Sequence, residues 1–492
     1  MDAHVGSLDG LLRAAAARWP HRPAVEAPSG SLTYAQLDAA VTAAAGGLLS
    51  AGARPGDRVA FALSHDAPLY TAPFVCSRIG VAGLLLSTSL APERWTDQLS
   101  RARVALSIAD DAHLDRVRAA TTGPVVPARA TFTLDDGTRD TDLPGVPEDP
   151  DRTVALIATS GTTGDPTIVR LTSRGLLHVG RAYLDVLDLG EDERSLVVMP
   201  LTYIGALSTQ TMTMPLVGGC NVIPTDTRPA GALQRMVDHG ITLLDAVPSW
   251  LTMLIREPPC DVPCWRTLVY GGAPMPPATV QGLAARHPNV ALHDVWGLTE
   301  AHGPVTALRY DPEHPPAPGA VGRPLPGLRV RTAGPGGPLP PGVAGELEVT
   351  GPTVRGGRLD GPAGGLRDGW LPTGDLGVVE ADGTVRVTDR KKDLILRGGA
   401  NVSAREVERV LASAPGVADA AAFAVPDALG GEAVGAAVVT KAAASLDTAA
   451  LRRLVAERIG AHAVPRRILH LAELPRNATG KVDKRALQTM RR

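Results

Sequence analysis

The spacing of apolar side chains predicts alternating helices and strands up to about residue 330. Between residues 32 and 49, apolar side chains recur at intervals that place them on one face of a helix, at Leu32, Leu37, Val41 and Leu48. Short apolar runs typical of strands follow along the chain, among them Val154–Thr159, Ser195–Met199 and Thr267–Tyr270. Because strands alternate with helices in this way, the sequence predicts layered α/β architecture.

The pattern changes after Gly319. From Gly319 to Asp389, short strand-like pieces are separated by glycine and proline turns, which predicts a β-rich subdomain. The residues that follow mix both patterns, with helices expected over Arg405–Ala414 and Thr448–Ile459 and strands over Ala418–Val425 and Val434–Thr440. We therefore expect an α/β protein with a large N-terminal domain, residues 1–390, built of layered α/β subdomains plus the β-rich subdomain. A small α+β C-terminal domain, residues 391–492, would follow it.

The composition is that of a soluble globular chain. Of the 492 residues, 44% are hydrophobic and 20% are charged. Lysine plus arginine number 49 and aspartate plus glutamate 51, which gives a net charge of −2. A protein that coats nucleic acid would carry a basic excess, so we expect no nucleic-acid partner. A nucleotide ligand is compatible with this balance, since backbone N–H groups can hold its phosphates.

Cysteine usage and the absence of long apolar runs indicate a cytoplasmic protein. The chain has four cysteines, and Cys260 and Cys264 lack a second Cys/His pair at metal-binding spacing. The N-terminus lacks a basic segment followed by an apolar one, and no apolar run reaches the roughly 20 residues that span a bilayer. We expect reduced structural thiols and no membrane partner.

A run of small hydroxyl residues and glycines follows the strand-like stretch Val154–Ala158. It reads Thr159-Ser160-Gly161-Thr162-Thr163-Gly164. Such a loop lets the backbone bend so that N–H groups and hydroxyls converge on phosphate oxygens. It is not a Walker loop, because no Gly-Lys-Ser/Thr ending follows. Taken alone, the loop is equally compatible with an ordinary polar turn.

Four further motifs follow this loop along the chain. They are Val295-Trp296-Gly297-Leu298-Thr299-Glu300, Leu371-Pro372-Thr373-Gly374-Asp375-Leu376-Gly377, Asp389-Arg390-Lys391-Lys392-Asp393 with Gly398-Gly399 behind it, and Pro475–Val482. With these motifs in this order over nearly its whole length, the chain resembles the adenylate-forming superfamily of acyl- and aryl-CoA ligases, stand-alone adenylation enzymes and luciferases. The resemblance implies that a small-molecule acid and ATP form an acyl- or aryl-adenylate and pyrophosphate. Transfer to a thiol, above all that of coenzyme A, would follow.

The resemblance also implies roles for individual residues in nucleotide binding. Glu300 would hold Mg²⁺ near the phosphates, with Thr299 beside the α-phosphate. Asp375 would accept hydrogen bonds from ribose hydroxyls, and Arg390 would face the ribose or a phosphate. Lys481 would be a mobile point charge that reaches the attacking carboxylate oxygen and the α-phosphate. The other nucleotide-binding residues implied are Gly272, Ala273, Pro274, Trp296 and Gly297.

A moving C-terminal domain and an acid pocket are implied as well. Lys392 lies where the family has its hinge, so the small domain would rotate between adenylation and transfer. Gly398 and Gly399 would then face the incoming thiol or its pantetheine arm. No acidic residue stands out as a partner for a substrate amino group, and Asp245 is the nearest candidate. The substrate is therefore expected to be an acyl or aryl acid rather than an α-amino acid. The implied pocket residues are Tyr203, Ala246 and Gly271.

The chain departs from the family pattern at and after the phosphate loop, and at two single positions further along. Thr167 stands where the phosphate loop usually carries lysine, and Ser173 where a histidine follows. A charge-assisted phosphate contact worth about 1.5–3 kcal/mol is therefore missing, which predicts slower or weaker ATP use, with Arg170 as a weak candidate replacement. Tyr203 stands where the family commonly has a histidine or another aromatic residue, and Ala404 where proline is usual. We expect little from the last change.

Three other interpretations stay open. The adenylate could be loaded onto a separate carrier protein, since the sequence ends 11 residues after Lys481 and leaves no room for a fused carrier domain. The acceptor could instead be an amine or hydroxyl, or the activated acid could be non-carboxylic, such as nitrite in a diazotising enzyme. A catalytically inactive binding protein is disfavoured by the presence of Glu300, Asp375, Arg390 and Lys481.

Overall fold

The computed structural model describes residues 5–490 except 133–142, 144, 160–166, 355, 360–364, 392, 398–399, 428–431, 442–445 and 478–480. The described residues pack as two compact units. The first holds residues 1–316, 321–329 and 349–371, and the second holds residues 317–320, 330–348 and 372–492. Residues 330–348 and 372–390 thus group with the C-terminal residues, and the domain boundary expected at residue 390 stays a prediction.

The first unit begins with a six-stranded sheet in the order β6-β5-β3-β4-β7-β8. Its strands are β3 (Arg58–Ala62), β4 (Ala82–Leu85), β5 (Leu106–Ala109), β6 (Val125–Pro127), β7 (Thr153–Thr159) and β8 (Thr167–Thr172). Neighbours run parallel, except that β7 and β8 pair antiparallel. Alternation along β3 sends Val59 and Phe61 to one buried face and Ala60 and Ala62 to the other.

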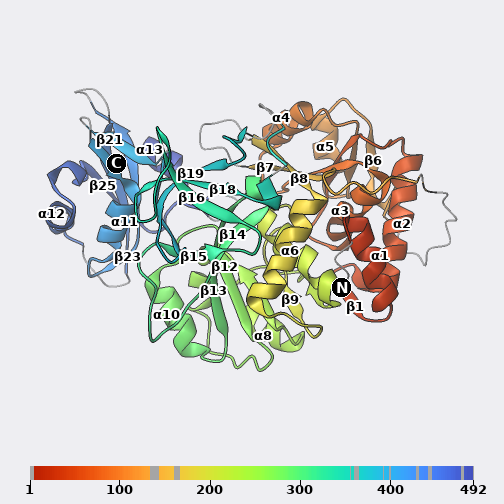
Figure 1. The fold of residues 1–492 in the computed structure, drawn as a ribbon, viewed down its shortest axis with the longest axis horizontal. Coiled ribbons are helices and arrows are strands. Elements are labelled where there is room, and N and C mark those ends of the chain that lie inside the picture. Colours follow the sequence, from red (N-terminus) through yellow and green to blue (C-terminus); the bar gives the residue numbers. More distant parts are fainter. Residues whose placement is uncertain are drawn as a thin grey trace. The chain divides into compact units, whose positions relative to one another are not determined.

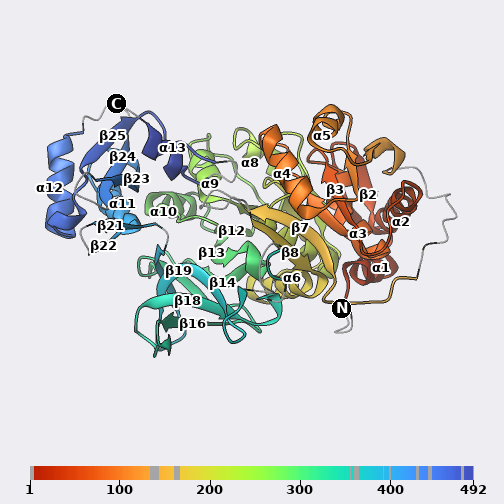
Figure 2. The same cartoon turned by 90° about the horizontal axis from the view of Figure 1, so that it is seen from above.

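Helices cover both faces of this sheet. Those on the Phe61 face are α1 (Leu8–Arg18), α2 (Tyr34–Ser50) and α3 (Ala67–Ile79), and those on the Ala60 face are α4 (Pro92–Ala102) and α5 (Leu114–Ala120). Figure 2 shows α4 and α5 across β3 from α3. α2 starts near its expected position because Thr33 and Gln36 exchange side-chain-to-backbone hydrogen bonds as a capping box.

A second sheet of the first unit runs in the order β15-β14-β13-β12-β11-β9-β10-β1-β2. The strands from β13 to β1 in this order are parallel, and β2, β14 and β15 are antiparallel to their neighbours. The bounds are β1 (Pro23–Ala27), β2 (Gly30–Thr33), β9 (Arg194–Leu196), β10 (Cys220–Val222), β11 (Leu243–Ala246), β12 (Thr267–Gly271), β13 (Ala291–Leu298), β14 (Gly303–Arg309) and β15 (Ala320–Pro324).

One helix, α6 (Ser173–Leu187), belongs to the cores of both sheets. Its Leu176 and Leu177 pack with the Phe61 face of the first sheet, and its Tyr183 and Leu187 pack with Leu243 of β11. Figure 1 shows α6, in yellow, between α3 and β14. The opposite face of the second sheet is covered by α8 (Ala232–Asp238), α9 (Pro248–Leu254) and α10 (Pro277–Arg286).

The second unit combines β-rich and α+β parts. Its β-rich part has strands in the order β17-β16-β18-β19-β20: β16 (Arg329–Gly334), β17 (Gly337–Pro338), β18 (Gly345–Thr350), β19 (Leu371–Val379) and β20 (Val385–Arg390). The rest comprises β21 (Leu394–Arg397), β22 (Ala400–Ser403), β23 (Val417–Pro426), β24 (Glu432–Thr440) and β25 (Arg467–Leu471), with α11 (Ala404–Ala412), α12 (Thr448–Arg458) and α13 (Lys484–Thr489). The predicted α/β class, with a β-rich part and a small α+β part, is confirmed.

Candidate active site

The predicted phosphate loop joins β7 to β8. The two strands pair antiparallel up to Thr159 opposite Thr167, where the Thr159 hydroxyl donates to the Thr167 carbonyl oxygen at 3.2 Å. The residues predicted to cradle phosphates between them, Ser160, Gly161, Thr162, Thr163 and Gly164, lie outside the described residues. The structure establishes where this loop begins and ends, at the last residue of β7 and at the first residue of the edge strand β8.

Three neighbouring parallel strands of the second sheet end close together. β11 ends at Ala246, β12 at Gly271 and β13 at Leu298, and their registers place Ala246 beside Tyr270 and Gly271 beside Val295. Open α/β sheets bind ligands at the carboxyl ends of their strands. The structure thus brings the predicted acid-pocket residues Ala246 and Gly271 to such an edge, with the predicted nucleotide-binding residues Gly272, Ala273, Pro274, Trp296 and Gly297 in the segments that follow or adjoin it.

The glycines at this edge of the sheet occur for different structural reasons. At Gly271 a Cβ atom would lie 2.3 Å from the Val295 carbonyl oxygen, and at Gly297 it would lie 2.0 Å from that of Gly303, so neighbouring strands require glycine there. Gly272 differs, since it has φ +78° and no atom lies within 4 Å of a Cβ position. Gly272 therefore leaves open space at the strand ends, as a ligand that approaches the backbone would need.

Tyr203 is half-buried, between the end of β9 and η2 (Ala206–Thr211), a π-helical segment. Burial raises the pKa of its hydroxyl, and hydrogen bonds with Ser89 and Ser87 oppose that rise. The tyrosine is neutral at physiological pH and presents both a ring face and a hydroxyl dipole. Such a side chain can stack on an acid or form a hydrogen bond with it.

Asp245 lies one residue before Ala246 but is engaged inside the protein. The Thr209 hydroxyl of η2 donates to its Oδ2 at 2.7 Å, and the residue is 5% exposed. Burial raises its pKa to about 7, an effect that the Thr209 hydrogen bond opposes. Its hydrogen-bond partner therefore lies in the π-helical segment, which disfavours Asp245 as the group that binds a substrate amino group.

Glu300 lies on the short turn η3 (Thr299–Ala301) that joins β13 to β14. Its side chain is 17% exposed, and its Oε1 lies 3.4 Å from Nη2 of Arg358, whose side chain is 56% exposed. Thr299 begins the same turn directly after β13, so both predicted catalytic residues of this motif occupy one turn. The contact with Arg358, 58 residues away in sequence, was not predicted.

His302 anchors this turn, a role that the sequence motifs did not reveal. Its Nε2 accepts the backbone N–H of Thr172 at 2.9 Å, so Nδ1 carries the hydrogen and donates to the Thr353 carbonyl oxygen at 2.5 Å. The residue is fully buried at φ +64°, and burial lowers its pKa to about 4. A neutral imidazole thus ties the Glu300 turn to the start of α6 and to η4 (Pro352–Val354). A histidine two residues after Glu300 was the only signal.

The residues of the turn fit a magnesium ion shared with phosphates. Glu300 offers carboxylate oxygens, the ligands that Mg²⁺ prefers, and within the described chain no group of three His, Cys, Asp or Glu side chains could hold a metal by itself. Mg²⁺ is commonly held by one or two carboxylates together with phosphate oxygens and water. The donor set at Glu300 therefore suits a metal that arrives with a nucleotide.

Asp375 and Arg390 form an ion pair in the second unit. They face each other in register on β19 and β20, and Arg390 Nε lies 2.7 Å from Asp375 Oδ1. The Asp375 side chain is 5% exposed, and its backbone N–H donates to the Thr373 hydroxyl at 3.1 Å. The structure thus brings together the two residues implied to face the ribose, through an ion pair that the sequence did not predict.

Lys481 follows a loop whose ends are joined. Its N–H donates to Asn477 Oδ1 at 3.0 Å, its carbonyl oxygen accepts the Asn477 N–H at 2.8 Å, and Arg476 pairs with Val482 as a β-bridge. Just beyond, Lys484 Nζ lies 2.8 Å from Glu408 Oε1 of α11. The predicted hinge residue Lys392 and the predicted thiol-binding residues Gly398 and Gly399 lie outside the described residues.

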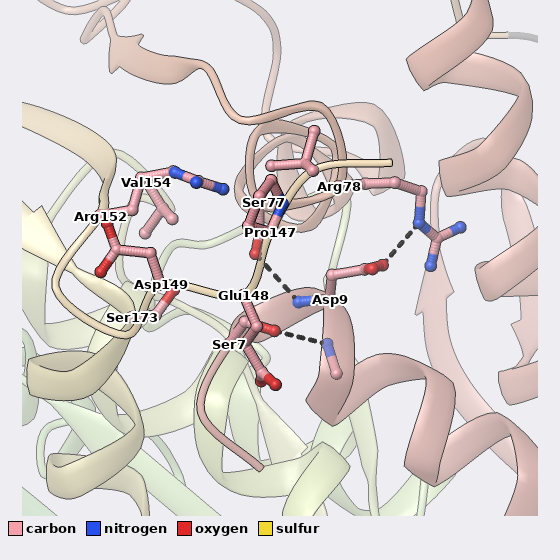
Figure 3. Close-up of a pocket in the computed structure, with 12 residues that line it drawn as sticks. Ser7, Asp9, Ser77, Arg78, Pro147, Glu148, Asp149, Arg152, Val154 and Ser173 are labelled. Atoms are coloured by element: carbon pink, nitrogen blue, oxygen red, sulfur yellow. Dashed lines mark hydrogen bonds and ion pairs between the residues drawn. The ribbon is translucent and has the colours of Figure 1, made fainter. Parts of the chain in front are cut away.

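A cavity of about 170 Å³ occurs elsewhere in the first unit (Figure 3). It is lined by Asp9 of α1, Arg78 of α3, the Pro147–Asp149 segment and Ser173 at the start of α6. Several of its charged groups have partners, since Arg78 Nε lies 2.6 Å from Asp9 Oδ1 and Glu148 accepts a hydrogen bond from the Gly6 N–H. None of the predicted site residues lines it, so the strand ends and the Glu300 turn remain the candidate active site of the first unit.

Comparison with known proteins gives the family. The AMP-binding enzyme family model matches residues 12–357, more than half of the chain, and the model of the AMP-binding enzyme C-terminal domain matches residues 406–481. The chain belongs to the AMP-binding enzyme family. This AMP-binding enzyme is 36% identical to a feruloyl-CoA synthase of an Amycolatopsis species, over 94% of this chain and 95% of that protein. It is 32% identical to the sulfoacetate–CoA ligase of Cupriavidus necator, over 97% and 96%. The solved structure of ATP-bound MatB from Rhodopseudomonas palustris matches it with a TM-score of 0.88 at 26% identity, over 98% of each chain.

The AMP-binding enzyme is an ATP-dependent, AMP-forming acid–CoA ligase. The expectations of adenylate formation and of ATP, Mg²⁺ and coenzyme A are thereby confirmed. Within the described residues, every helix is too short or too polar to cross a membrane. The roles of the individual site residues stay predictions.

Proposed function

We propose that this ligase activates a carboxylic acid at the ends of β11, β12 and β13, with Glu300 as its magnesium ligand. The single observation that carries the proposal is the Glu300 turn. It holds a largely buried carboxylate on a segment that is fixed by His302. Among the described residues, no group of three His, Cys, Asp or Glu side chains would complete a metal site with it. A carboxylate so held supports a metal shared with ATP.

The acid we propose carries an aromatic ring. The identity of 36% with feruloyl-CoA synthase over nearly the whole of both chains supports this class. The half-buried ring of Tyr203 supports it as well, because an aromatic side chain can stack on an aromatic acid. Asp245 is held by Thr209, which favours an acid without an α-amino group.

The chain's own residues would divide the work of the first step. The acid's carboxylate oxygen attacks the α-phosphorus of ATP and forms the new O–P bond of the adenylate. The bond from the α-phosphorus to the oxygen that bridges to the β-phosphate breaks, and pyrophosphate leaves with its electrons. Thr299 would donate a hydrogen bond to the α-phosphate, and Lys481 Nζ would offset the charge that develops there. Asp375, oriented by Arg390, would accept hydrogen bonds from the ribose.

The second step would use a different set of residues. The thiolate of coenzyme A attacks the acyl carbon, and AMP leaves with the carboxylate oxygen that had joined the phosphate. We propose that the small domain turns at Lys392 between the two steps and that Gly398 and Gly399 then admit the pantetheine arm. The family match over residues 406–481 supports a distinct C-terminal domain after this hinge.

A panel of acids tests the proposed substrate class. Release of pyrophosphate from ATP and Mg²⁺ should depend on the acid, and hydroxycinnamic, benzoic and arylacetic acids should exceed alkanoic and α-amino acids at equal concentration. Preference for an alkanoic or amino acid would contradict the aromatic class. Absence of acid-dependent release with every member would contradict the assignment of the site.

The acceptor is tested with the best acid of that panel. Coenzyme A, a phosphopantetheinylated carrier protein and a simple amine are supplied in parallel, and thioester or amide formation is followed by mass spectrometry. We expect the acyl-CoA to form fastest. Faster formation of the carrier thioester or of the amide would replace coenzyme A as the acceptor while leaving the adenylation step intact.

A further inference from the structure

The candidate site has no lysine at the position that usually serves the phosphates. Thr167, the first residue of β8, is neutral. Arg170 on the same strand was a weak candidate to replace that lysine, and its Nε donates to the Gly356 carbonyl oxygen at 3.0 Å. Part of the Arg170 guanidinium therefore holds the backbone, and the positive charge for the phosphates has to be sought on a neighbouring segment.

Residues 356–359 lie along β8 as an added antiparallel segment. The N–H of Arg170 donates to the Gly357 carbonyl oxygen at 3.0 Å, and that of Leu359 donates to the Ile168 carbonyl oxygen at 2.7 Å. Val169 and Arg358 are directly opposite each other between these two hydrogen bonds. The Leu359 side chain packs against the core cluster that contains Ile168. The backbone at Arg358 is thus fixed on both sides.

This pairing puts the Arg358 side chain on the same face of the strand as that of Thr167. Residues opposite each other in an antiparallel pair project to one face, so Arg358 shares the face of Val169. Thr167 precedes Val169 by two positions on β8 and therefore projects to that face too. A cation at Arg358 can accordingly serve the region that a lysine at residue 167 would serve.

The guanidinium of Arg358 is available for a second partner. Its Nη2 lies 3.4 Å from Glu300 Oε1, a long contact, and its side chain is 56% exposed. Because the contact is long and the arginine side of the pair is exposed, the pair contributes little stability, and a change of partner costs little. The contact nevertheless places the guanidinium beside the carboxylate to which we assign the magnesium ion.

We propose that Arg358 binds the β- or γ-phosphate of ATP and supplies the positive charge that β8 lacks at Thr167. The inference rests on the proposed role of the Glu300 turn in holding Mg²⁺ and ATP. Arg358 approaches the same phosphates from the neighbouring segment, where its planar fork can pair two phosphate oxygens. In the structure its guanidinium faces Glu300, and with the nucleotide bound it turns to the phosphates.

Equilibrium binding without turnover tests this inference. Titration calorimetry with Mg²⁺-ATP and with AMP, in the absence of acid, is carried out on the unaltered enzyme, on Arg358→Gln and on Arg118→Gln. Arg118 is the matched control, since its side chain is also 56% exposed and also pairs with a carboxylate, that of Asp115 at 3.3 Å. We expect Arg358→Gln to bind ATP at least 10-fold more weakly, on the order of one charge-assisted hydrogen bond. Its affinity for AMP should stay within about twofold, and Arg118→Gln should match the unaltered enzyme.

A second substitution tests whether charge alone is what Arg358 contributes. Thr167→Lys in the Arg358→Gln background should restore most of the lost ATP affinity, because it returns a cation to the same face of β8. The inference is overturned if Arg358→Gln binds ATP normally, if it loses ATP and AMP alike, or if Thr167→Lys restores nothing. Failure of the unaltered enzyme to bind ATP would instead contradict the proposed function. If Arg358→Gln does not fold, Arg358→Lys, which keeps the charge, serves in the same comparison, with a smaller loss expected for ATP only.

Discussion

At the scale of residues, the candidate site depends on side chains whose partners are distant in sequence. His302 joins Thr172 and Thr353, which are 130 and 51 positions away, and Glu300 meets Arg358, 58 positions away. Such contacts leave no periodic signal, so the sequence could identify Glu300 by its motif but not the groups that hold it. The same holds for the Asp375–Arg390 pair, whose register depends on how two strands align.

Removal of the His302 imidazole should destabilise the first unit. His302→Ala leaves the buried N–H of Thr172 and the carbonyl oxygen of Thr353 without partners, at about 1–3 kcal/mol for each unsatisfied group. Urea unfolding should show a loss of about 2–6 kcal/mol. His314→Ala, which removes an exposed histidine paired with Asp311, should change stability by less than about 0.5 kcal/mol. Equal effects of the two substitutions would contradict the anchoring role.

Glu300 should be required for the first step of the reaction. Glu300→Gln removes the charge but keeps the shape, and we expect acid-dependent pyrophosphate release to fall at least about 100-fold at saturating ATP, since electrostatic groups at a reacting centre contribute on this scale. Excess Mg²⁺ should recover part of the loss. The exposed Glu313 offers a control, for which Glu313→Gln should have no effect. A variant at residue 300 with normal release would remove Glu300 from the site.

At the scale of elements, apolar periodicity predicted much of the fold. The helix expected over residues 32–49 is α2, and the β-rich stretch after Gly319 forms β15 to β20. Two of the sequence motifs also lie where strands end, at Thr159 of β7 and at Leu298 of β13. Periodicity could not show that residues 356–359 pair with β8, because that short segment is held by backbone hydrogen bonds rather than by an apolar repeat of its own.

His293 on strand β13 should make the stability of the protein depend on pH. His293 on this strand is 6% exposed, and burial, with Arg309 nearby, lowers its pKa to about 4. The unfolded chain, with a histidine pKa of about 6.5, takes up a proton first as the pH falls, so stability is retained above about pH 6.5 and lost below it. From pH 7 to pH 5 this histidine alone should reduce the free energy of unfolding by about 2 kcal/mol. Urea titrations of His293→Gln should show a correspondingly smaller change in the free energy of unfolding between pH 7 and pH 5. The same pH dependence as in the unaltered protein would contradict the assignment.

At the scale of the whole molecule, the residues to which we assign roles in the two half-reactions belong to different units. Glu300, Tyr203 and the strand ends belong to the first, and Asp375, Arg390 and Lys481 belong to the second. We expect Lys481→Ala to reduce adenylate formation at least about 100-fold and to leave thioester formation from a supplied acyl-adenylate largely intact. Lys392→Pro should do the reverse, because proline restricts the backbone at the hinge. Equal loss of both steps in either variant would contradict the division of roles.

The central claim is that a carboxylate oxygen of the acid becomes bonded to the α-phosphate of ATP at the Glu300 turn. Its most direct test is one turnover with acid labelled by ¹⁸O in the carboxylate, ATP, Mg²⁺ and coenzyme A, with both nucleotide and pyrophosphate analysed by mass spectrometry. We expect one ¹⁸O in AMP and none in pyrophosphate. Label in pyrophosphate or inorganic phosphate, or AMP without label beside a labelled thioester, would contradict the claim.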